Sequence, residues 1–457
     1  MYRRVAIIGG GAAAAALLSE LLERQPPQPL HLDWYTGGGN SPRGVAYGTR
    51  SDKHLLNVRA ASMSMFTARP HGFLDFAQRG DSAIAGTDFL PRRLYGDYLE
   101  AEVERALERA RAAGHDVRVL PFAVDAIVPE SDGVTVIHGE ENAHVDAAVL
   151  AIGSLPPQPL SGVADAALAS GRYVTEPWGF LAQAKPDARP LKVVLIGLGL
   201  TAVDVLLELS ALWPNATFEA ISRHGLLPEP HLHQASAPAD DGSELIESMR
   251  EAPYIRTWIR LLREAVAQSA DWRTVIDSLR PHTPSLWALL PEAERSRFLR
   301  HARWAWERVR HRMPPQVMAA MKALEDAGRL HRRRGRLQAV DVAGDKLHLD
   351  IRLPHGKGVE TMDADLVIQT VGLNTDVRRT QHALIRQLTT NGHVTADPLG
   401  LGVTATTEGR VKHGEQTWPH FYAIGTLLRG VLWESTAMPE IRQQARNLAD
   451  RLVKSEK

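Results

Sequence analysis

The residues with the clearest chemical use form two glycine-rich turns, in RVAIIGGGAAAAAL and again in VVLIGLGLTAVDV. In the first turn, Gly9 would let the chain reverse tightly, and Gly11 would let a phosphate approach the backbone without a Cβ in the way. Gly197 and Gly199 hold the same places in the second turn. The spacing therefore predicts two sites for the pyrophosphate of a dinucleotide, each at the beginning of a helix.

Small residues continue both patterns. Ala14 and Ala202 stand at the third position of each motif, where a small side chain lets the helix pack closely on its strand. Thr201, beside Ala202, places a hydroxyl at the start of the second helix. One such motif alone can be an ordinary tight turn, but two of them, each after a predicted strand, support one another.

The strand that follows each turn indicates which nucleotide the site accepts. A carboxylate commonly ends this strand and binds the ribose hydroxyls. The first unit instead ends LHLDWYT, with Thr36 last and Asp33 earlier and expected to face inward. In TFEAISRHG of the second unit, Arg223 replaces the acid. A guanidinium there suits the 2′-phosphate of NADPH, and an arginine on a solvated strand end is the alternative.

The elements around the two turns repeat one plan. Residues 117–153 and 329–372 each alternate as short antiparallel strands and end in an apolar strand, closed by Gly153 and Gly372 respectively. Each half therefore predicts a nucleotide-binding fold with a β-meander before its last parallel strand. A further strand, FYAIGT, ends in Gly425 and Thr426, and we expect it to return and complete the first unit.

Over nearly its whole length the chain resembles the FAD/NAD(P)-binding proteins, two-nucleotide flavoproteins related to N-hydroxylating and Baeyer–Villiger-type flavin monooxygenases. The segments that carry the resemblance are RGVAYGT, HLLNVRAASMSMF, FLPRRLYGDYL, ISRHGLLP, RHRMPP, ADLVIQTVGL and GTLLRGVLWESTAMPEIR. The resemblance implies FAD in the first site and NADPH in the second. It also implies loops near the flavin, at Gly44 to Tyr47 and at His54 to Asn57. The family more often carries an acid near Thr36, and often an Asp where this chain has Thr426.

The expected fold class is α/β, with two Rossmann-like dinucleotide-binding domains and an all-helical insert. The NADPH domain would be inserted in the FAD domain. We expect the FAD domain to comprise residues 1–160 and 376–457, the NADPH domain residues 161–235 and 331–375, and the helical insert residues 236–330.

The C-terminal stretch LLRGVLWESTAMPEIRQQARNL predicts a helix with Ser435 and Thr436 as possible caps and Pro439 in an early turn. Such a helix would direct its positive end towards reduced flavin, which is anionic; an ordinary capped helix is the alternative. The candidate catalytic residues are His54 and Asn57, as hydrogen-bond donors to flavin or nicotinamide, and Arg429. A structural role is the alternative for each.

The segment between the two halves of the second unit is helical in pattern, and Arg297 to Met313 would form one helix within it. Half of the ten tryptophans fall in this segment: Trp258, Trp272, Trp287, Trp304 and Trp306. They would form a helical core or, alternatively, line a substrate pocket. A basic run follows, comprising Arg308, Arg310, His311 and Arg312. It would be an exposed helix face or a site for a phosphate or carboxylate.

Composition excludes several classes of function. Lys+Arg and Asp+Glu both number 53 among 457 residues, so no overall charge favours nucleic acid or an anionic membrane. The basic start and the apolar run over residues 5–18 could mark a secretory leader, but its glycine turn favours a soluble cytoplasmic protein. The histidines show no metal-binding spacing. The absence of cysteine excludes disulfide-reductase chemistry through an internal thiol pair.

Two dinucleotides in one chain indicate hydride transfer from nicotinamide to flavin. The leading hypothesis is an NADPH-dependent FAD monooxygenase that uses O2 and a flavin C4a-hydroperoxide on a small polar or amine-containing substrate, because the family resemblance favours it. A flavin reductase or dehydrogenase without oxygenation is the first alternative. A flavoprotein that senses redox state or supports a partner is the second.

Overall fold

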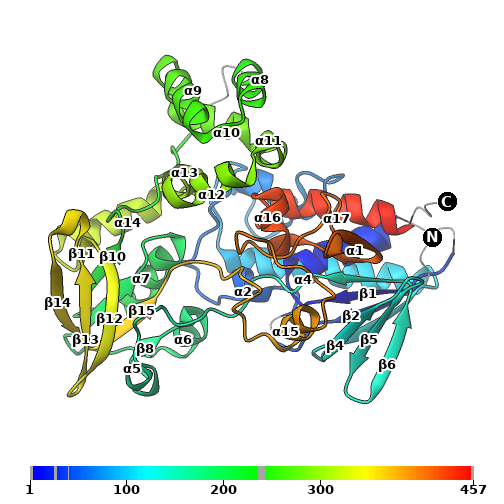
Figure 1. Ribbon diagram of the computed structural model, residues 1–457, viewed down its shortest axis with the longest axis horizontal. Coiled ribbons are helices and arrows are strands. Elements are labelled where there is room, and N and C mark those ends of the chain that lie inside the picture. Colours follow the sequence, from blue (N-terminus) through cyan, green and yellow to red (C-terminus); the bar gives the residue numbers. More distant parts are fainter. Residues whose placement is uncertain (1–3, 25–27, 40, 235–241, 454–457) are drawn as a thin grey trace.

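The computed structural model describes residues 4–24, 28–39, 41–234 and 242–453. The first of its two large sheets is parallel except for one edge strand, and it contains both the first strand and the last strand of the described chain (Figure 1). Its strands, in spatial order, are β16 (Arg410–His413), β17 (Gln416–Ala423), β7 (Ala147–Leu150), β1 (Arg4–Ile8), β2 (His31–Tyr35) and β3 (Asp116–Leu120). Strand β17 pairs in parallel with β7, so the late strand does return to the first unit as expected.

The second large sheet is built entirely from parallel pairs. Its strands, in spatial order, are β11 (Leu330–Arg334), β10 (Thr217–Ser222), β9 (Lys192–Ile196), β15 (Leu366–Gln369) and β8 (Tyr173–Val174). All of them lie in the sequence between β7 and β17, so the second unit is inserted in the first. The predicted fold class is therefore confirmed.

Each unit also carries a three-stranded antiparallel meander. The first comprises β4 (Ala126–Pro129), β5 (Val134–His138) and β6 (Glu141–Val145); the second comprises β12 (Arg336–Ala343), β13 (Lys346–Arg352) and β14 (Val359–Ala364). The prediction that each whole run is antiparallel is wrong for its first strand, because β3 and β11 join the large sheets in parallel register. Alternating polarity identified these strands but could not tell an edge strand of a parallel sheet from a meander strand.

Helices cover the first sheet and fix the first turn. The helices of this unit are α1 (Ala12–Glu23), α2 (Gly44–Tyr47), α3 (Gly72–Gly80), α4 (Arg92–Ala112), α15 (Ala383–Thr390), α16 (Arg429–Leu432) and α17 (Met438–Val453). Helix α1 packs between α4 and α17, and its Leu17, Leu18 and Leu21 are completely buried. Burial of each leucine is worth about 1.5–3 kcal/mol, which anchors the helix whose beginning faces the predicted pyrophosphate.

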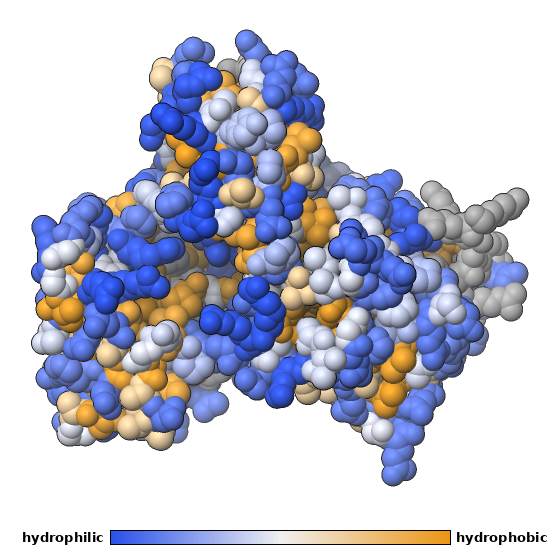
Figure 2. All heavy atoms as spheres, viewed as in Figure 1, coloured by the Kyte–Doolittle hydropathy of each residue, from blue (hydrophilic) through white to orange (hydrophobic). Residues whose placement is uncertain are grey.

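The second unit and the insert contain the remaining helices. They are α5 (Asp165–Ala169), α6 (Pro177–Gln183), α7 (Leu200–Leu212), α8 (Ser243–Glu251), α9 (Ile255–Gln268), α10 (Trp272–Leu279), α11 (Thr283–Leu289), α12 (Glu292–His301), α13 (Arg303–Arg310) and α14 (Pro315–Asp326). Helices α8 to α13 stand out from the two sheets (Figures 1 and 2). The prediction of a single helix over Arg297 to Met313 is wrong, because the helix is interrupted at Ala302, between α12 and α13.

Helix α14 packs against α7, and its Val317 and Met321 belong to the core of the second sheet. It lies in the range predicted for the insert, and the domain boundaries remain predictions. Among the described residues, no helix combines the length and the apolar character needed to cross a membrane.

Candidate dinucleotide sites

The first glycine turn depends on the lack of a side chain at Gly9. Gly9 has φ +131°, and a Cβ there would lie 2.3 Å from the carbonyl oxygen of Ala151 on the strand next to it. Gly11, just before α1, is extended, and a Cβ there would find no atom closer than 3.9 Å. In the part of the chain that the structure describes, no side chain caps α1, and its first turn contains no acid. The amide groups at this helix end are therefore free to bind an anion.

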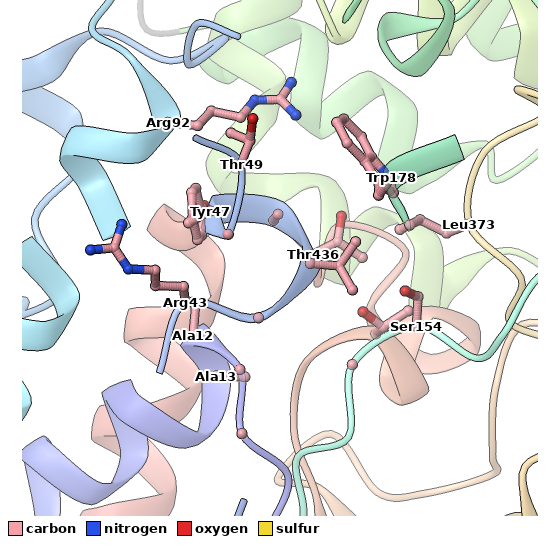
Figure 3. Close-up of a pocket in the computed structure, with 18 of the residues that line it drawn as sticks. Ala12, Ala13, Arg43, Tyr47, Thr49, Arg92, Ser154, Trp178, Leu373 and Thr436 are labelled. Carbon is pink, nitrogen blue, oxygen red and sulfur yellow. The ribbon is translucent and has the colours of Figure 1, made fainter. Parts of the chain in front are cut away.

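These amides face a pocket of about 1110 Å³ that both nucleotide units line (Figure 3). Ala12 and Ala13 contribute from the first unit, whereas Thr201, Trp178 and Leu373 contribute from the second. The nine residues predicted for a site that line this pocket are Gly11, Thr36, Gly44, Tyr47, His54, Gly153, Thr201, Gly425 and Thr426. A volume of this size, shared by the two units, can hold a flavin and the ring that reduces it.

The other predicted residues do not line the pocket. They are Gly9, Ala14, Asn57, Gly197, Gly199, Ala202, Arg223, Gly372, Arg429 and Ser435. Ala14 and Ala202 are fully buried, as expected for close packing of each helix on its strand. The backbone carbonyl of Asn57 accepts a hydrogen bond from His231 Nε2 at 3.0 Å. This contact gives the Asn57 backbone a structural partner, and Asn57 is not among the residues that line the pocket.

His54 lines the pocket but has protein partners at both ring nitrogens. Nε2 donates to the carbonyl of Asp204 on α7 at 3.1 Å, so Nδ1 accepts from the Thr49 hydroxyl at 2.7 Å when the ring is neutral. Burial lowers the pKa of His54, although Asp204 partly opposes the shift. The neutral imidazole therefore ties the loop of the first unit to α7 of the second, and we expect it to position them.

Two pocket residues that the sequence did not single out lie beside His54. Arg92 on α4 makes an ion pair with Asp204 at 2.9 Å, and this pair also crosses between the units. Trp178 on α6 places its ring edge-on to His54, with 5.8 Å between the ring centroids. Arg92 falls inside FLPRRLYGDYL, but nothing local in that segment indicates a partner on α7.

The second glycine turn has the same construction as the first. Gly197 has φ +117°, and a Cβ there would lie 2.4 Å from the carbonyl oxygen of Thr370. Gly199 precedes α7 with φ −82°, and a Cβ there would meet nothing within 4 Å. Helix α7 also has no side-chain cap and no acid in its first turn. The second glycine turn and the beginning of α7, which together form the second phosphate cradle, are therefore open to an anion as well.

Two exposed arginines meet at the end of the second strand of this unit. Arg223 follows β10, and Arg334 ends β11, where it pairs in register with Ser222. Among the described residues, neither guanidinium has an ion-pair partner. Burial is the largest cause that lowers the pKa of His224, and the positive charges of Arg223 and Arg334 add to it. The His224 ring stacks on Trp304 of α13, with 3.9 Å between the ring centroids. We therefore expect Arg334 to lie close enough to Arg223 to join it at the predicted phosphate contact.

We expect Arg334→Ala, like Arg223→Ala, to lower the preference for NADPH over NADH about tenfold or more. A hydrogen bond to a charged group is worth about 1.5–3 kcal/mol. NADH lacks the 2′-phosphate that would accept this bond, so the substitution should weaken the binding of NADPH and leave that of NADH unchanged. Anaerobic titration with each nucleotide measures the preference. Arg256→Ala, at an exposed arginine of α9, is the control. An unchanged ratio in both Arg334→Ala and Arg223→Ala would remove these residues from the phosphate site.

Several expectations about single residues need correction. Ser435 does not cap α17: the amides of Glu440 and Ile441 bond to the carbonyl of Ala437, and the buried Ser435 Oγ has no hydrogen-bond partner among the described residues. Arg310 and Arg312 do not form an exposed face, because they are only 7% and 3% exposed. Arg429 does not line the pocket and forms an ion pair with Glu307 at 2.8 Å, and its catalytic role stays a prediction.

The remaining expectations concern the insert and Asp33. None of the five insert tryptophans lines the pocket, and Trp258 and Trp287 lie in the helical core. Asp33 faces inward as expected and binds Arg4 and Arg118. One exposed group, Glu130, Asp132 and His144, brings three ligand-type atoms within 4.8 Å of one another. It lies outside all predicted sites.

Three histidines whose pKa values are lowered by partial or full burial predict acid sensitivity. Burial lowers the pKa of His231 to about 3, and it also lowers the pKa values of His54 and His311. The unfolded chain binds protons at these rings below about pH 6.5, while the folded chain stays neutral, so stability is full above that pH and falls as the pH drops. We expect His231 alone to contribute a loss of about 1.4 kcal/mol per pH unit between pH 6 and pH 4.

Thermal unfolding between pH 7.5 and pH 4.5 measures this loss. His231→Asn keeps a donor for the Asn57 carbonyl but does not titrate, so its melting temperature should fall less steeply with acid. Equal slopes for the wild type and His231→Asn would contradict the prediction.

The comparisons with known proteins agree with this geometry. Residues 6–155 match the family model described as FAD-NAD(P)-binding, which confirms the resemblance over that range. No curated protein sequence matches the chain. Among solved structures, ornithine N-hydroxylase from Kutzneria sp. 744 has a TM-score of 0.65 at 15% identity, with 99% of both chains covered. L-lysine 6-monooxygenase from Pseudomonas syringae has a TM-score of 0.66 at 16% identity, again over 99% of both chains.

Two further structures extend the range of similar folds. The FAD-bound cadaverine monooxygenase from Erwinia amylovora has a TM-score of 0.64 at 13% identity, over 99% of this chain and 94% of that one. Bacillithiol disulfide reductase from Staphylococcus aureus has a TM-score of 0.55 at 12% identity, over 98% and 97%. At such identities the likeness concerns the fold, which is shared along the whole chain.

Proposed function

We propose that this chain, whose residues 6–155 match an FAD-NAD(P)-binding family and whose fold is that of N-hydroxylating flavin monooxygenases, is an FAD-dependent oxidoreductase reduced by NADPH. One observation carries the proposal: a single pocket of about 1110 Å³ is lined by the helix beginnings of both units, through Gly11 and Thr201. Such a pocket lets two bound dinucleotides bring their rings together. A cytoplasmic location remains a prediction.

The residues of the first unit fit FAD. The open backbone at Gly11 and the free amides of α1 would bind the pyrophosphate, and Thr36 would lie at the ribose. Gly44 and Tyr47 would form a wall beside the ring system. Bound FAD would accept two electrons from a nicotinamide and pass them to O2 or another acceptor. The protein would contribute binding, orientation and exclusion of water.

The residues of the second unit fit NADPH. The open cradle at Gly199 would bind the pyrophosphate, and Arg223 with Arg334 would bind the 2′-phosphate. The neutral His54 and the Arg92–Asp204 ion pair would hold α7 at a fixed place relative to the flavin loop. This placement would bring the donor ring to the side of the pocket formed by Trp178 and Leu373.

A monooxygenase acting on a small amine-containing substrate is the specific form of the proposal. Support comes from the fold, which is shared with hydroxylases whose names give ornithine, lysine and cadaverine as substrates. A reductase that passes electrons to another acceptor is the second candidate, because the fold is also shared with a disulfide reductase. The chain contains no cysteine, so that acceptor would have to be external.

Spectroscopy of the purified protein tests the proposal. We expect a yellow protein that NADPH bleaches anaerobically at lower concentration than NADH does. The reduced protein is then mixed with O2 and L-ornithine, L-lysine or cadaverine in a stopped-flow instrument. A transient that is neither reduced nor oxidised flavin, followed by a hydroxylamine product, supports the monooxygenase. Direct reoxidation with release of peroxide, for every amine, supports the reductase. A colourless protein that takes up no FAD would overturn both.

A further inference from the structure

The chain between two residues of the first site makes an excursion to the helical insert. Thr426 and Thr436 both line the pocket. Between them the chain leaves the sheet, forms α16 and packs against α11 of the insert before it returns (Figure 1). The insert therefore contacts a segment whose two ends belong to the pocket wall.

The return passes through a strained turn at Trp433. Trp433 has φ +58° and ψ −64°, and the amide of Glu434 donates to the carbonyl of Leu432 at 2.7 Å. These features define a γ-turn with positive φ, which is rare and strained for a residue with a side chain. Such a conformation persists only where the surroundings hold it, and these positions cluster at functional sites. Thr436 follows three residues later.

Aromatic residues of the insert hold this turn. The Trp433 ring is only 4% exposed; it stacks on Trp287 of α11 at 4.9 Å and meets Phe298 of α12 edge-on at 5.1 Å. Trp287 also donates from Nε1 to the carbonyl of Gly430 at 2.8 Å. Both insert residues therefore fix the excursion from outside the pocket.

Polar contacts from α13 reinforce the grip on each side of Trp433. On one side, Arg429 binds Glu307 at 2.8 Å and lies over the Trp433 ring at 4.6 Å. On the other side, Trp306 Nε1 donates to Glu434 at 3.1 Å. The insert thus contacts the chain before the turn, at Arg429, and directly after it, at Glu434, so we expect the chain that runs on to Thr436 to have little freedom.

We infer that the helical insert positions the Thr436 wall of the FAD site through the strained turn at Trp433. In this inference Trp287 and Phe298 are positioning residues, although neither lines the pocket. The inference rests on the proposed function, because it takes FAD as the occupant of that site. If the grip is lost, the turn relaxes to an unstrained conformation and Thr436 moves with it.

A pair of substitutions at Trp433 separates the turn from the packing. Trp433→Ala removes the ring and keeps the penalty for positive φ, so we expect the turn to relax and the Kd for FAD to rise about tenfold, or ~1.4 kcal/mol. Trp433→Gly also removes the ring but accepts φ +58° readily. Its Kd should rise less, to about threefold. Trp287→Phe keeps a smaller ring and loses the bond to Gly430, so it should fall between the wild type and Trp433→Ala.

Titration of FAD into the deflavinated protein measures each Kd, and visible circular dichroism reports the surroundings of the bound flavin. Trp272→Ala is the control and should resemble the wild type, because the ring contacts of this half-buried insert tryptophan in the described residues are with Arg273 and Arg312. Should Trp433→Ala fail to fold, the comparison of Trp287→Phe with the wild type decides.

The inference is supported if the Kd for FAD is lowest in the wild type, higher in Trp433→Gly and highest in Trp433→Ala. Equal values for the Ala and Gly variants, or values and spectra that match the Trp272→Ala control, overturn it while leaving the proposed function intact. A wild-type protein that takes up no FAD overturns the proposed function itself, and the inference with it.

Discussion

Gly199→Ala is expected to weaken NADPH binding about 10- to 100-fold and to leave FAD content and melting temperature unchanged. The apoprotein fold accepts the methyl group, because Gly199 has φ −82° and nothing lies within 4 Å of its Cβ position. The methyl would stand where the pyrophosphate has to approach the backbone. An inserted carbon in a close-fitting site costs about 1–3 kcal/mol, which corresponds to this range of affinity.

The reciprocal change at the first site is Gly11→Ala. Its Cβ position is 3.9 Å from the nearest atom, so we expect the variant to fold and its affinity for FAD to fall by a similar factor. Gly197→Ala is the contrasting variant, because φ +117° and a 2.4 Å approach to the Thr370 carbonyl oppose any side chain there. We expect that variant to lose stability as well as NADPH.

Flavin content, melting temperature and the NADPH dependence of flavin reduction distinguish these outcomes. If Gly199→Ala binds NADPH as the wild type does, the second cradle does not hold the pyrophosphate. If Gly199→Ala and Gly11→Ala each reduce the binding of both nucleotides equally, the two turns do not serve separate sites.

Arg92→Ala is expected to cause the largest loss of stability among single charge removals between the units. Arg92 and Asp204 form an ion pair at 2.9 Å, and their side chains are only 14% and 7% exposed. Removal of one partner of a buried pair leaves the other charge without compensation and costs about 3–5 kcal/mol. For a chain of this size the melting temperature should fall by about 3–5 °C. Burial already raises the pKa of Asp204, so proton uptake by this residue would recover part of the loss at low pH.

The neighbouring arginine provides a matched control. Arg93 pairs with Asp52 at 2.9 Å, but these side chains are 42% and 66% exposed, so Arg93→Ala should cost no more than about 1 kcal/mol. Differential scanning calorimetry compares the variants. The double variant Arg92→Leu/Asp204→Leu removes both charges and should recover much of the stability lost in Arg92→Ala. If Arg92→Ala unfolds at the same temperature as Arg93→Ala, the buried pair does not hold the units together.

The amino-acid sequence alone determined the two cradles and the plan of the fold. A glycine turn before a helix is a local feature: Gly9 and Gly197 need positive φ, and Gly11 and Gly199 need open space, whatever lies elsewhere in the chain. Apolar lead-in strands and the late strand FYAIGT likewise follow from short-range patterns. The absence of cysteine needs no structure to exclude an internal thiol pair.

The tertiary structure decided which charged and polar side chains meet. Parallel pairing of β10 with β11 brings Arg334 beside Arg223, and the packing of α7 gives His54 its partner 150 residues away. Packing of the insert also buries Arg310, which a helical pattern would place on an exposed face. The period of a helix or strand records which face is apolar. It does not record which distant segment covers that face, and that segment sets the partners, the burial and the protonation of these residues.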